Sequence, residues 1–260
     1  MQAVVTLLCG GLVGFSLGLI GGGGSILAVP LLLYVVGVRD PHVAIGTSAL
    51  AVGVNAAFNL LGHWRVGNVK WPCAAAFAGA GVAGAALGST LGKLVDGQKL
   101  LLLFSCVMLA VGMAMLRPRA SGGDPGVRIN PAIAARLLGV GFLTGAISGF
   151  FGIGGGFLIV PGIMLGSGMP ILNAIGSSLF SVAAFGMTTA ANYALSGLVD
   201  WPVAVEFILG GVVGGLLGIR LATGLAGRRR MLASIFAGVI FAVALYMAVR
   251  TVIALHGHRG

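Results

Sequence analysis

Apolar residues form eight long segments that short polar stretches separate. The segments cover residues 3–37, 42–62, 72–94, 98–116, 137–167, 171–193, 201–224 and 231–254. Several of them reach the roughly 20 apolar residues that a helix needs to cross a bilayer. One extended polar stretch, RPRASGGDPGVRINP, separates the first four segments from the last four. The pattern predicts an all-α polytopic membrane protein with a first transmembrane repeat at 1–116, a cytoplasmic linker at 117–131 and a second repeat at 132–260.

Composition narrows the class further. The chain is 58% hydrophobic and 8% charged, too little charge to cover a soluble protein of 260 residues. The net charge of +10 comes from basic residues between the apolar segments. There they set topology and contact anionic lipid heads, so we expect a lipid bilayer as partner and no nucleic acid. Cys9, Cys73 and Cys106 lie in apolar runs and predict small buried side chains rather than a disulfide or a metal site.

The two halves repeat one another. An offset of 130 residues aligns AIGTS at 44–48 with AIGSS at 174–178, and GNVKWP at 67–72 with GLVDWP at 197–202. Between 41 and 92 there are 17 identities in 52 aligned positions. Small residues recur every four positions in both halves, which places them on one helix face where two helices approach closely. Duplicated halves of this kind are typical of secondary transporters.

Glycine runs interrupt the first segment of each half, GLIGGGGSILAVP at 18–30 and GFFGIGGGFLIVP at 149–161. The helix from Ser25 to Gly37 would be about 20 Å long, too short to span the bilayer core. We therefore expect each segment to be a helical hairpin with its glycines at the tip. Three transmembrane helices then follow, and the two repeats are inverted. With hairpins, ten basic residues fall on one side and five on the other, which places the linker in the cytoplasm.

Unwound backbone within a membrane needs a partner or a water-filled cavity. A helix that resumes after a glycine break points free N–H groups and a positive dipole end toward the break, which favours an anion. We expect two such breaks to form one substrate site at the membrane midplane. The residues expected to bind substrate are those of the two breaks and the adjacent repeat motifs: Gly22, Gly23, Gly24, Ser25, Thr47, Ser48, Asn55, Gly154, Gly155, Gly156, Ser177 and Ser178. Helix packing by glycine is the alternative reading.

A polar stripe on the segment at 42–62 continues this site. Ser48, Asn55, Asn59 and His63 are spaced to share one helix face, where they either line a pathway or join helices. Pathway or coupling residues are expected at Asn59, His63, Thr189, Asn192 and Glu206. Glu206 is the one acid inside an apolar segment, and a protonatable carboxylate suits proton coupling. No catalytic set appears, so we expect neither an enzyme nor a cofactor nor a metal.

Taken as a set, these motifs resemble the TauE/SafE-type sulfite exporter family, also called the toluenesulfonate uptake permeases. The resemblance rests on Gly21–Gly24, Pro30, Ala44–Ser48 and Trp71 and on their counterparts Gly152–Gly156, Pro161, Ala174–Ser178 and Trp201. It implies a multi-pass transporter of the bacterial inner membrane for sulfite, sulfonates or other small anions. Asp200, before the second tryptophan, has Lys70 as its counterpart, which departs from a shared acidic position.

The sequence thus predicts a secondary transporter, an exporter of a small sulfur-containing or organic anion that works by alternating access. The alternatives are an uncoupled anion channel and a membrane scaffold or assembly factor. Substrate, direction, coupling ion and oligomeric state, a homo-oligomer included, stay open at this stage.

Overall fold

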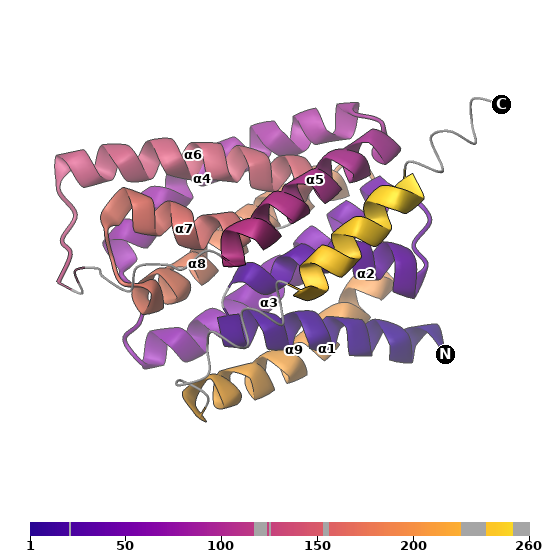
Figure 1. Ribbon diagram of the computed structural model, residues 1–260, viewed down its shortest axis with the longest axis horizontal. Helices are drawn as coiled ribbons and strands as arrows, with labels where there is room; N and C mark the ends of the chain where they lie inside the picture. The colour runs from indigo at the N-terminus through magenta and orange to yellow at the C-terminus, as the bar shows by residue number, and fades with distance from the viewer. Residues whose placement is uncertain (21, 117–123, 125, 153–155, 225–237, 252–260) are drawn as a thin grey trace.

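The computed structural model describes residues 1–20, 22–116, 124, 126–152, 156–224 and 238–251, and all its regular elements are helical (Figure 1). The first half contains α1 (Gln2–Ile20), η1 (Gly22–Leu27), α2 (Ala28–Leu31), η2 (Leu32–Val36), α3 (Pro41–Arg65), α4 (Trp71–Leu94) and α5 (Gly97–Leu116). The second contains α6 (Pro131–Phe151), α7 (Gly156–Ser167), α8 (Ile171–Ala194), α9 (Trp201–Gly224) and a last helix, Gly238–Thr251. The expected helical class is confirmed.

Local sequence explains where the long helices begin. The carboxylate of Asp40 accepts hydrogen bonds from the backbone of His42 and Val43, and Pro41 opens α3. Asn130 caps α6 in the same way by accepting from Ile133 N–H. Such caps satisfy the first N–H groups of a helix, which have no partner within it. Each helix therefore starts directly after its polar connection.

Helices of the two halves are interleaved. Figure 1 shows α1 beside α9 along one long edge and α6 beside α4 along the other, with α3 and α8 between these pairs. The helices α1 and α9 run parallel, because Gly10 meets Phe207 and Gly18 meets Gly215. In contrast, α3 and α8 run antiparallel, with Gly46 against Tyr193 and Gly53 against Gly186. Both pairings thus join one half to the other.

The regularly spaced glycines create these close pairings. A Cβ atom added to Gly14 would collide with the backbone of Gly211, and one added to Gly145 would collide with the backbone of Gly81. The same holds for Gly214, whose added Cβ would meet the backbone of Gly11. Small residues on both partners let the helix axes approach until backbone touches backbone. The predicted close-approach face is confirmed on both glycine seams, the contact of α1 with α9 and the contact of α4 with α6.

Both glycine-broken segments are hairpins. The side-chain amide of Gln2, at the start of α1, donates to the carbonyl of Val36, at the end of η2, over 3.3 Å. In the second half α7 returns along α6, since a Cβ on Gly166 would lie 2.8 Å from the side chain of Leu137. The two ends of each broken segment therefore lie at one end of the molecule.

Within the described residues, six helices, α1, α3, α4, α6, α8 and α9, are long and apolar enough to cross a membrane, and shorter apolar helices accompany them. Many large apolar side chains on their outer faces are exposed, among them Leu87, Leu143 and Leu217. This is expected where lipid, rather than water, surrounds the helices. It also explains why one sequence expectation is wrong: Cys9 and Cys73 are buried, but Cys106 is exposed on α5. An apolar run in a membrane protein can face lipid as well as the core.

Candidate functional site

The two hairpins meet inside the bundle, where η1 of the first contacts α7 of the second. At the second break, α6 ends at Phe151 and is capped by Gly152, whose φ of 65° is the left-handed conformation that favours glycine. The hydroxyl of Ser48 on α3 donates to the carbonyl of Gly152 at 3.3 Å and to that of Ile45 at 2.9 Å. The AIGTS motif and the second glycine break, predicted as parts of one site, are therefore in contact. Gly154 and Gly155 lie outside the described residues.

The first break folds tightly onto α1. A Cβ on Gly24 would lie 2.5 Å from the Cβ of Ser16 and 2.7 Å from the backbone nitrogen of Leu17. Ser25 is fully buried beyond it. Gly22 and Gly23 lie in η1, a short 3-10 helix. Backbone packs against backbone here, so a side chain at Gly24 has no room.

Thr47 and Ser177, repeat counterparts, make equivalent contacts across the two halves. The Thr47 hydroxyl accepts a hydrogen bond of 2.9 Å from the backbone N–H of Asp200. The Ser177 hydroxyl accepts one of 2.9 Å from the backbone N–H of Lys70. Each therefore holds the start of α9 or α4 on the opposite repeat. Ser178 instead donates within α8, to the carbonyl of Ile175 at 2.8 Å.

Asn55 and Asn59 lie on α3 where it faces α9. A Cβ on Gly211 would collide with the Asn55 amide, and one on Gly215 would lie 2.7 Å from Oδ1 of Asn59. Asn59 donates to the carbonyl of Asn55 at 2.9 Å. Asn55 is fully buried, and neither Nδ2 nor Oδ1 of its amide has a hydrogen-bond partner within the described ranges. A buried amide left unpaired in this way is costly and is a common mark of a ligand site.

On α8, where it faces α4, the repeat counterpart of Asn55 is Phe185. The ring of Phe185 stacks on that of Phe77, with centroids 6.2 Å apart. Thr189, the counterpart of Asn59, is fully buried, and its hydroxyl has no partner in the described part of the chain. The buried hydroxyls of Ser148 and Ser181 are likewise unpaired there. Polar groups therefore occupy both sides of the α3–α8 pair, and where α3 carries Asn55 and Asn59 the counterpart positions of α8 carry Phe185 and Thr189.

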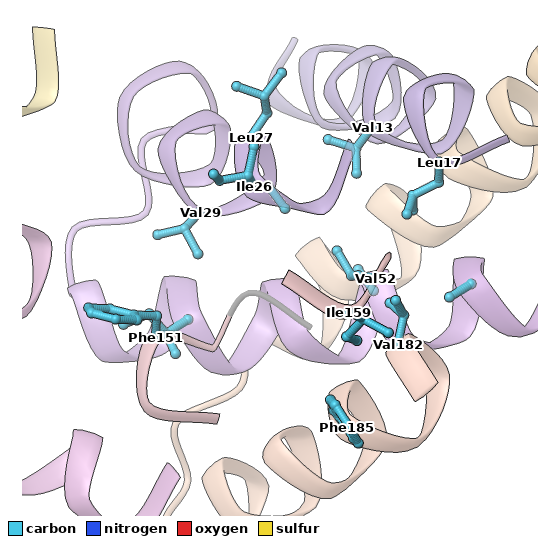
Figure 2. Close-up of a cluster of buried hydrophobic side chains, with 14 of the residues drawn as sticks. Val13, Leu17, Ile26, Leu27, Val29, Val52, Phe151, Ile159, Val182 and Phe185 are labelled. Atoms are coloured by element: carbon cyan, nitrogen blue, oxygen red, sulfur yellow. The ribbon is translucent and has the colours of Figure 1, made fainter. Parts of the chain in front are cut away.

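Apolar side chains close the centre. Figure 2 shows Val52, Val182 and Ile159 lying together between α3, α8 and α7. Val52 and Val182 are repeat counterparts, and all three side chains are fully buried. An ion could pass between the hairpins only if these side chains moved apart. The structure is therefore packed shut around the hairpin contact.

Asn192 lies at one end of the bundle, where it links α8 to α4. Its amide donates to Ser89 at 2.6 Å and to Thr90 at 2.9 Å. Lys93 donates in turn to the Asn192 carbonyl, to its Oδ1 and to Ser196, at 3.1, 2.7 and 2.9 Å. Two cavities open nearby, one of about 630 Å³ lined by Lys93, His42 and Arg39 and one of about 520 Å³ lined by Arg39, Arg250 and Tyr34. Arg39, Lys93 and Arg250 thus lie at this end, to which the hairpin topology assigns the smaller share, five, of the basic residues.

The remaining pathway residues do not join this group. His63 lies near the end of α3 beside Trp64, whose ring meets that of Trp71 edge-on at 6.0 Å. Glu206 is half-buried on α9, five residues after the exposed Trp201. At the end that holds Arg65, a cavity of about 190 Å³ is lined by Asn59, Gly62 and Arg65 together with apolar residues. Among the described residues, no group of three or more His, Cys, Asp or Glu side chains could hold a metal ion.

A polytopic helical bundle of two interleaved, similar halves, with paired glycine hairpins at its centre, defines a membrane transporter of the duplicated type. The model of the sulfite exporter TauE/SafE family matches residues 6–247, and the chain belongs to this family.

Several proteins are similar over most of the chain. A "Probable membrane transporter protein" of Xylella fastidiosa (strain Temecula1) is 53% identical over 251 residues, covering 95% of each chain. The "Probable membrane transporter protein YunE" of Bacillus subtilis is 28% identical over 239 residues, covering 84% of this chain and 88% of the relative. The Arabidopsis thaliana "Sulfite exporter TauE/SafE family protein 5" is 31% identical over 139 residues, 52% of this chain and 29% of that protein. No solved structure matches significantly.

Four polar residues that the structure singles out are missing from the sequence-based site: Lys93, Ser148, Ser181 and Tyr193. Ser181 follows Ser178 by three residues and precedes Thr189 by eight, so helical spacing alone could have found it. Lys93 has Thr223 as its counterpart, and nothing in the repeat distinguishes it from a loop lysine. Only the contact with α8 gives it a place beside a cavity.

Proposed function

We propose that this protein is a secondary transporter, an exporter of sulfite or a related small sulfur-containing or organic anion, which works by alternating access. The contact between the first hairpin and α7 of the second carries the proposal. In the proposed site, backbone N–H groups and helix ends at the two glycine breaks would hold the anion, which requires no fixed charge. Ser48, in contact with Gly152, supplies a hydroxyl beside that point.

We name sulfite as the substrate for two reasons, the family description, sulfite exporter, and the chemistry of the proposed site. The hydroxyls of Thr47 and Ser177 each accept a backbone N–H and keep their own hydrogen to donate to a ligand. The unpaired amide of Asn55 adds a further donor. Hydroxyl, amide and backbone donors suit the oxygens of sulfite or a sulfonate, whose negative charge is spread over several atoms.

Alternating access needs two conformations that exchange at low cost, and inverted repeats supply them. The antiparallel course of α3 and α8, which are repeat counterparts, supports an inverted arrangement. The excess of basic residues on the linker side supports placing residues 117–131 in the cytoplasm, and we propose a bacterial inner membrane. In this state Val52, Val182 and Ile159 close the centre, so transport requires their separation. Half-buried Glu206 is the residue we assign to proton coupling.

Counterflow of radiolabelled sulfite in proteoliposomes tests the function. A carrier loaded with unlabelled sulfite on the far side accelerates uptake of the label, because the loaded site returns faster than the empty one. We expect saturable uptake with this acceleration. Linear uptake without it, far above carrier rates, would instead show an uncoupled channel. An absence of flux for sulfite, sulfonates and short carboxylates, in protein that remains folded, would favour the scaffold.

Gly24 tests the hairpin site. Gly24→Leu has no room beside Ser16 and Leu17 and should abolish counterflow. Gly139→Leu is the matched control, because nothing lies within 4 Å of a Cβ at that position on α6. Normal counterflow in Gly24→Leu would refute the site assignment. Size-exclusion chromatography in detergent verifies that both variants insert and fold.

A further inference from the structure

We propose that the cavity of about 630 Å³ at the end of α4 is an outer binding site for a small oxyanion, with Lys93 as its charged residue. This site lies apart from the contact of the two hairpins, and none of the family motifs contributes a side chain to its lining. The choice of sulfite as the probe rests on the proposed function. The existence of an anion site at Lys93 does not.

The charge of Lys93 is the first reason. Its ammonium group is half-buried and donates all its hydrogen bonds to neutral oxygens, two of Asn192 and one of Ser196. No carboxylate in the described part of the chain forms an ion pair with it. The ring of Tyr193 lies below, 5.9 Å from Nζ. An ammonium held in a fixed position without a negative partner attracts an anion from the adjoining cavity.

The shape and lining of the cavity are the second reason. Arg39 and His42 line it together with Lys93. His42 Nδ1 is buried and has no hydrogen-bond partner among the described residues, and its ring lies 6.3 Å from that of Tyr193. The hydroxyl of fully buried Tyr193 is also unpaired there. Of these two residues only His42 lines the cavity; Tyr193 lies behind it, in contact with both His42 and Lys93. An unpaired polar atom on a lining residue is what a bound anion with its water could satisfy.

Two carboxylates line the same cavity, and both are engaged with helix starts. Asp40 accepts from the N–H groups of His42 and Val43 at the start of α3. Asp96 accepts from those of Gln98 and Lys99 at the start of α5. The positive ends of these helix dipoles offset the two negative charges locally. Lys93 and Arg39 therefore leave the cavity attractive to anions.

The repeat shows that this site belongs to one end only. At an offset of 130, Lys93 corresponds to Thr223, Asn192 to Gly62 and Ser196 to Val66. The opposite end therefore has neither the ammonium nor its acceptors in the equivalent place. An anion that reached Lys93 would replace the exposed Ser196 hydroxyl, a weaker acceptor than an anionic oxygen. The outer site would thus collect anions on one side of the membrane.

Isothermal titration of sodium sulfite into the purified full-length protein at low ionic strength tests the proposal. Lys93→Gln should weaken binding about tenfold, because it removes a unit charge near the ligand. Ser196→Asp should weaken it similarly, because it gives Lys93 a carboxylate partner while the contact with Asn192 remains. Ser196→Asn and Lys99→Gln are the matched controls and should stay within about twofold of the unmodified protein.

Equal affinity in Ser196→Asp and Ser196→Asn would overturn the proposal, and so would unchanged affinity in Lys93→Gln. The Ser196 pair keeps the test valid if Lys93→Gln fails to fold, since Ser196 is exposed. Binding that depends on Lys93 without any counterflow would refute the transport function but not the outer site. Counterflow together with unchanged sulfite affinity in Lys93→Gln and Ser196→Asp would refute the outer site but not the transport function.

Discussion

The hydroxyl of Thr47 accepts a hydrogen bond of 2.9 Å from the backbone N–H of Asp200, which lies in the other half of the chain. Its counterpart Ser177 repeats the bond with Lys70 at the same length. The residue that follows each AIG motif, Thr47 or Ser177, thus holds the start of a Trp-Pro helix, α9 or α4, in the other half. The repeat symmetry therefore includes contacts between the two halves as well as the elements within each half.

These two hydrogen bonds predict that removing either one lowers the stability of the protein by a similar amount. Thr47→Val and Ser177→Ala each remove the acceptor of a half-buried backbone N–H, which should cost about 1 kcal/mol of stability in either case. Thr47→Ser keeps the hydroxyl and should retain most of it. Thermal unfolding in detergent measures the effect. Equal melting temperatures for Thr47→Val and the unmodified protein would show that the bond contributes nothing.

The glycine seams predict where small residues are required. Gly14→Ala introduces a Cβ that collides with the backbone of Gly211 and should destabilise the bundle by about 1–3 kcal/mol. Gly145→Ala does the same against Gly81 and should have a similar effect. Gly79→Ala, on an exposed face of α4 with nothing within 4 Å, is the control. A loss of folded protein that is as large for Gly79→Ala would contradict the seam.

Asn55 separates stability from function. Its amide is fully buried without partners in the described structure, so Asn55→Leu should leave the melting temperature unchanged or raise it. If the amide binds substrate, the same variant should lower counterflow by at least about tenfold, the factor that loss of one good hydrogen bond represents. Phe185→Leu changes the repeat counterpart and should affect stability instead. Full counterflow in Asn55→Leu would exclude Asn55 from the site.

Much of this architecture could be predicted from sequence, because a repeat constrains it twice. The shared register of Gly10, Gly14 and Gly18 with Gly141, Gly145 and Gly149 indicated one close-packed face in each half. The lengths on either side of the glycine runs indicated hairpins, and the bond from Gln2 to Val36 agrees. The spacing of the glycines did not show which helix packs against each glycine face. Spacing places a residue on a helix side, but only the tertiary fold decides what that side meets.

The same limit applies to the site. Ser48 was expected near the second glycine run, and it contacts Gly152. Lys93 was counted only as a topology determinant, because its acceptors Asn192 and Ser196 lie about 100 residues away in the other half. Cys106 was expected to be buried from its apolar neighbours and is exposed. Hydropathy does not distinguish a face toward lipid from a face toward the core.

The inverted arrangement makes a prediction about the two Trp-Pro loops. Val66 and Leu195 are exposed residues of equivalent loops, one before α4 and one before α9. If the repeats are inverted and the linker is cytoplasmic, Val66 faces the cytoplasm and Leu195 the opposite side. A membrane-impermeant maleimide applied to intact spheroplasts should then label Leu195→Cys at once, and Val66→Cys only after permeabilisation. Cys9, Cys73 and Cys106 are first replaced by alanine.

Labelling of both positions from the same side would rule out inversion, because parallel repeats place equivalent loops together. Reversed labelling, with Val66→Cys reached from outside, would keep the inversion and place the linker outside the cell. The hairpins predict the first pattern specifically. Each broken segment returns to the end of the molecule at which it began. As a result α3 crosses the membrane in the opposite direction to its counterpart α8, and α4 in the opposite direction to α9. A single pass through either glycine run would change the side of every later loop.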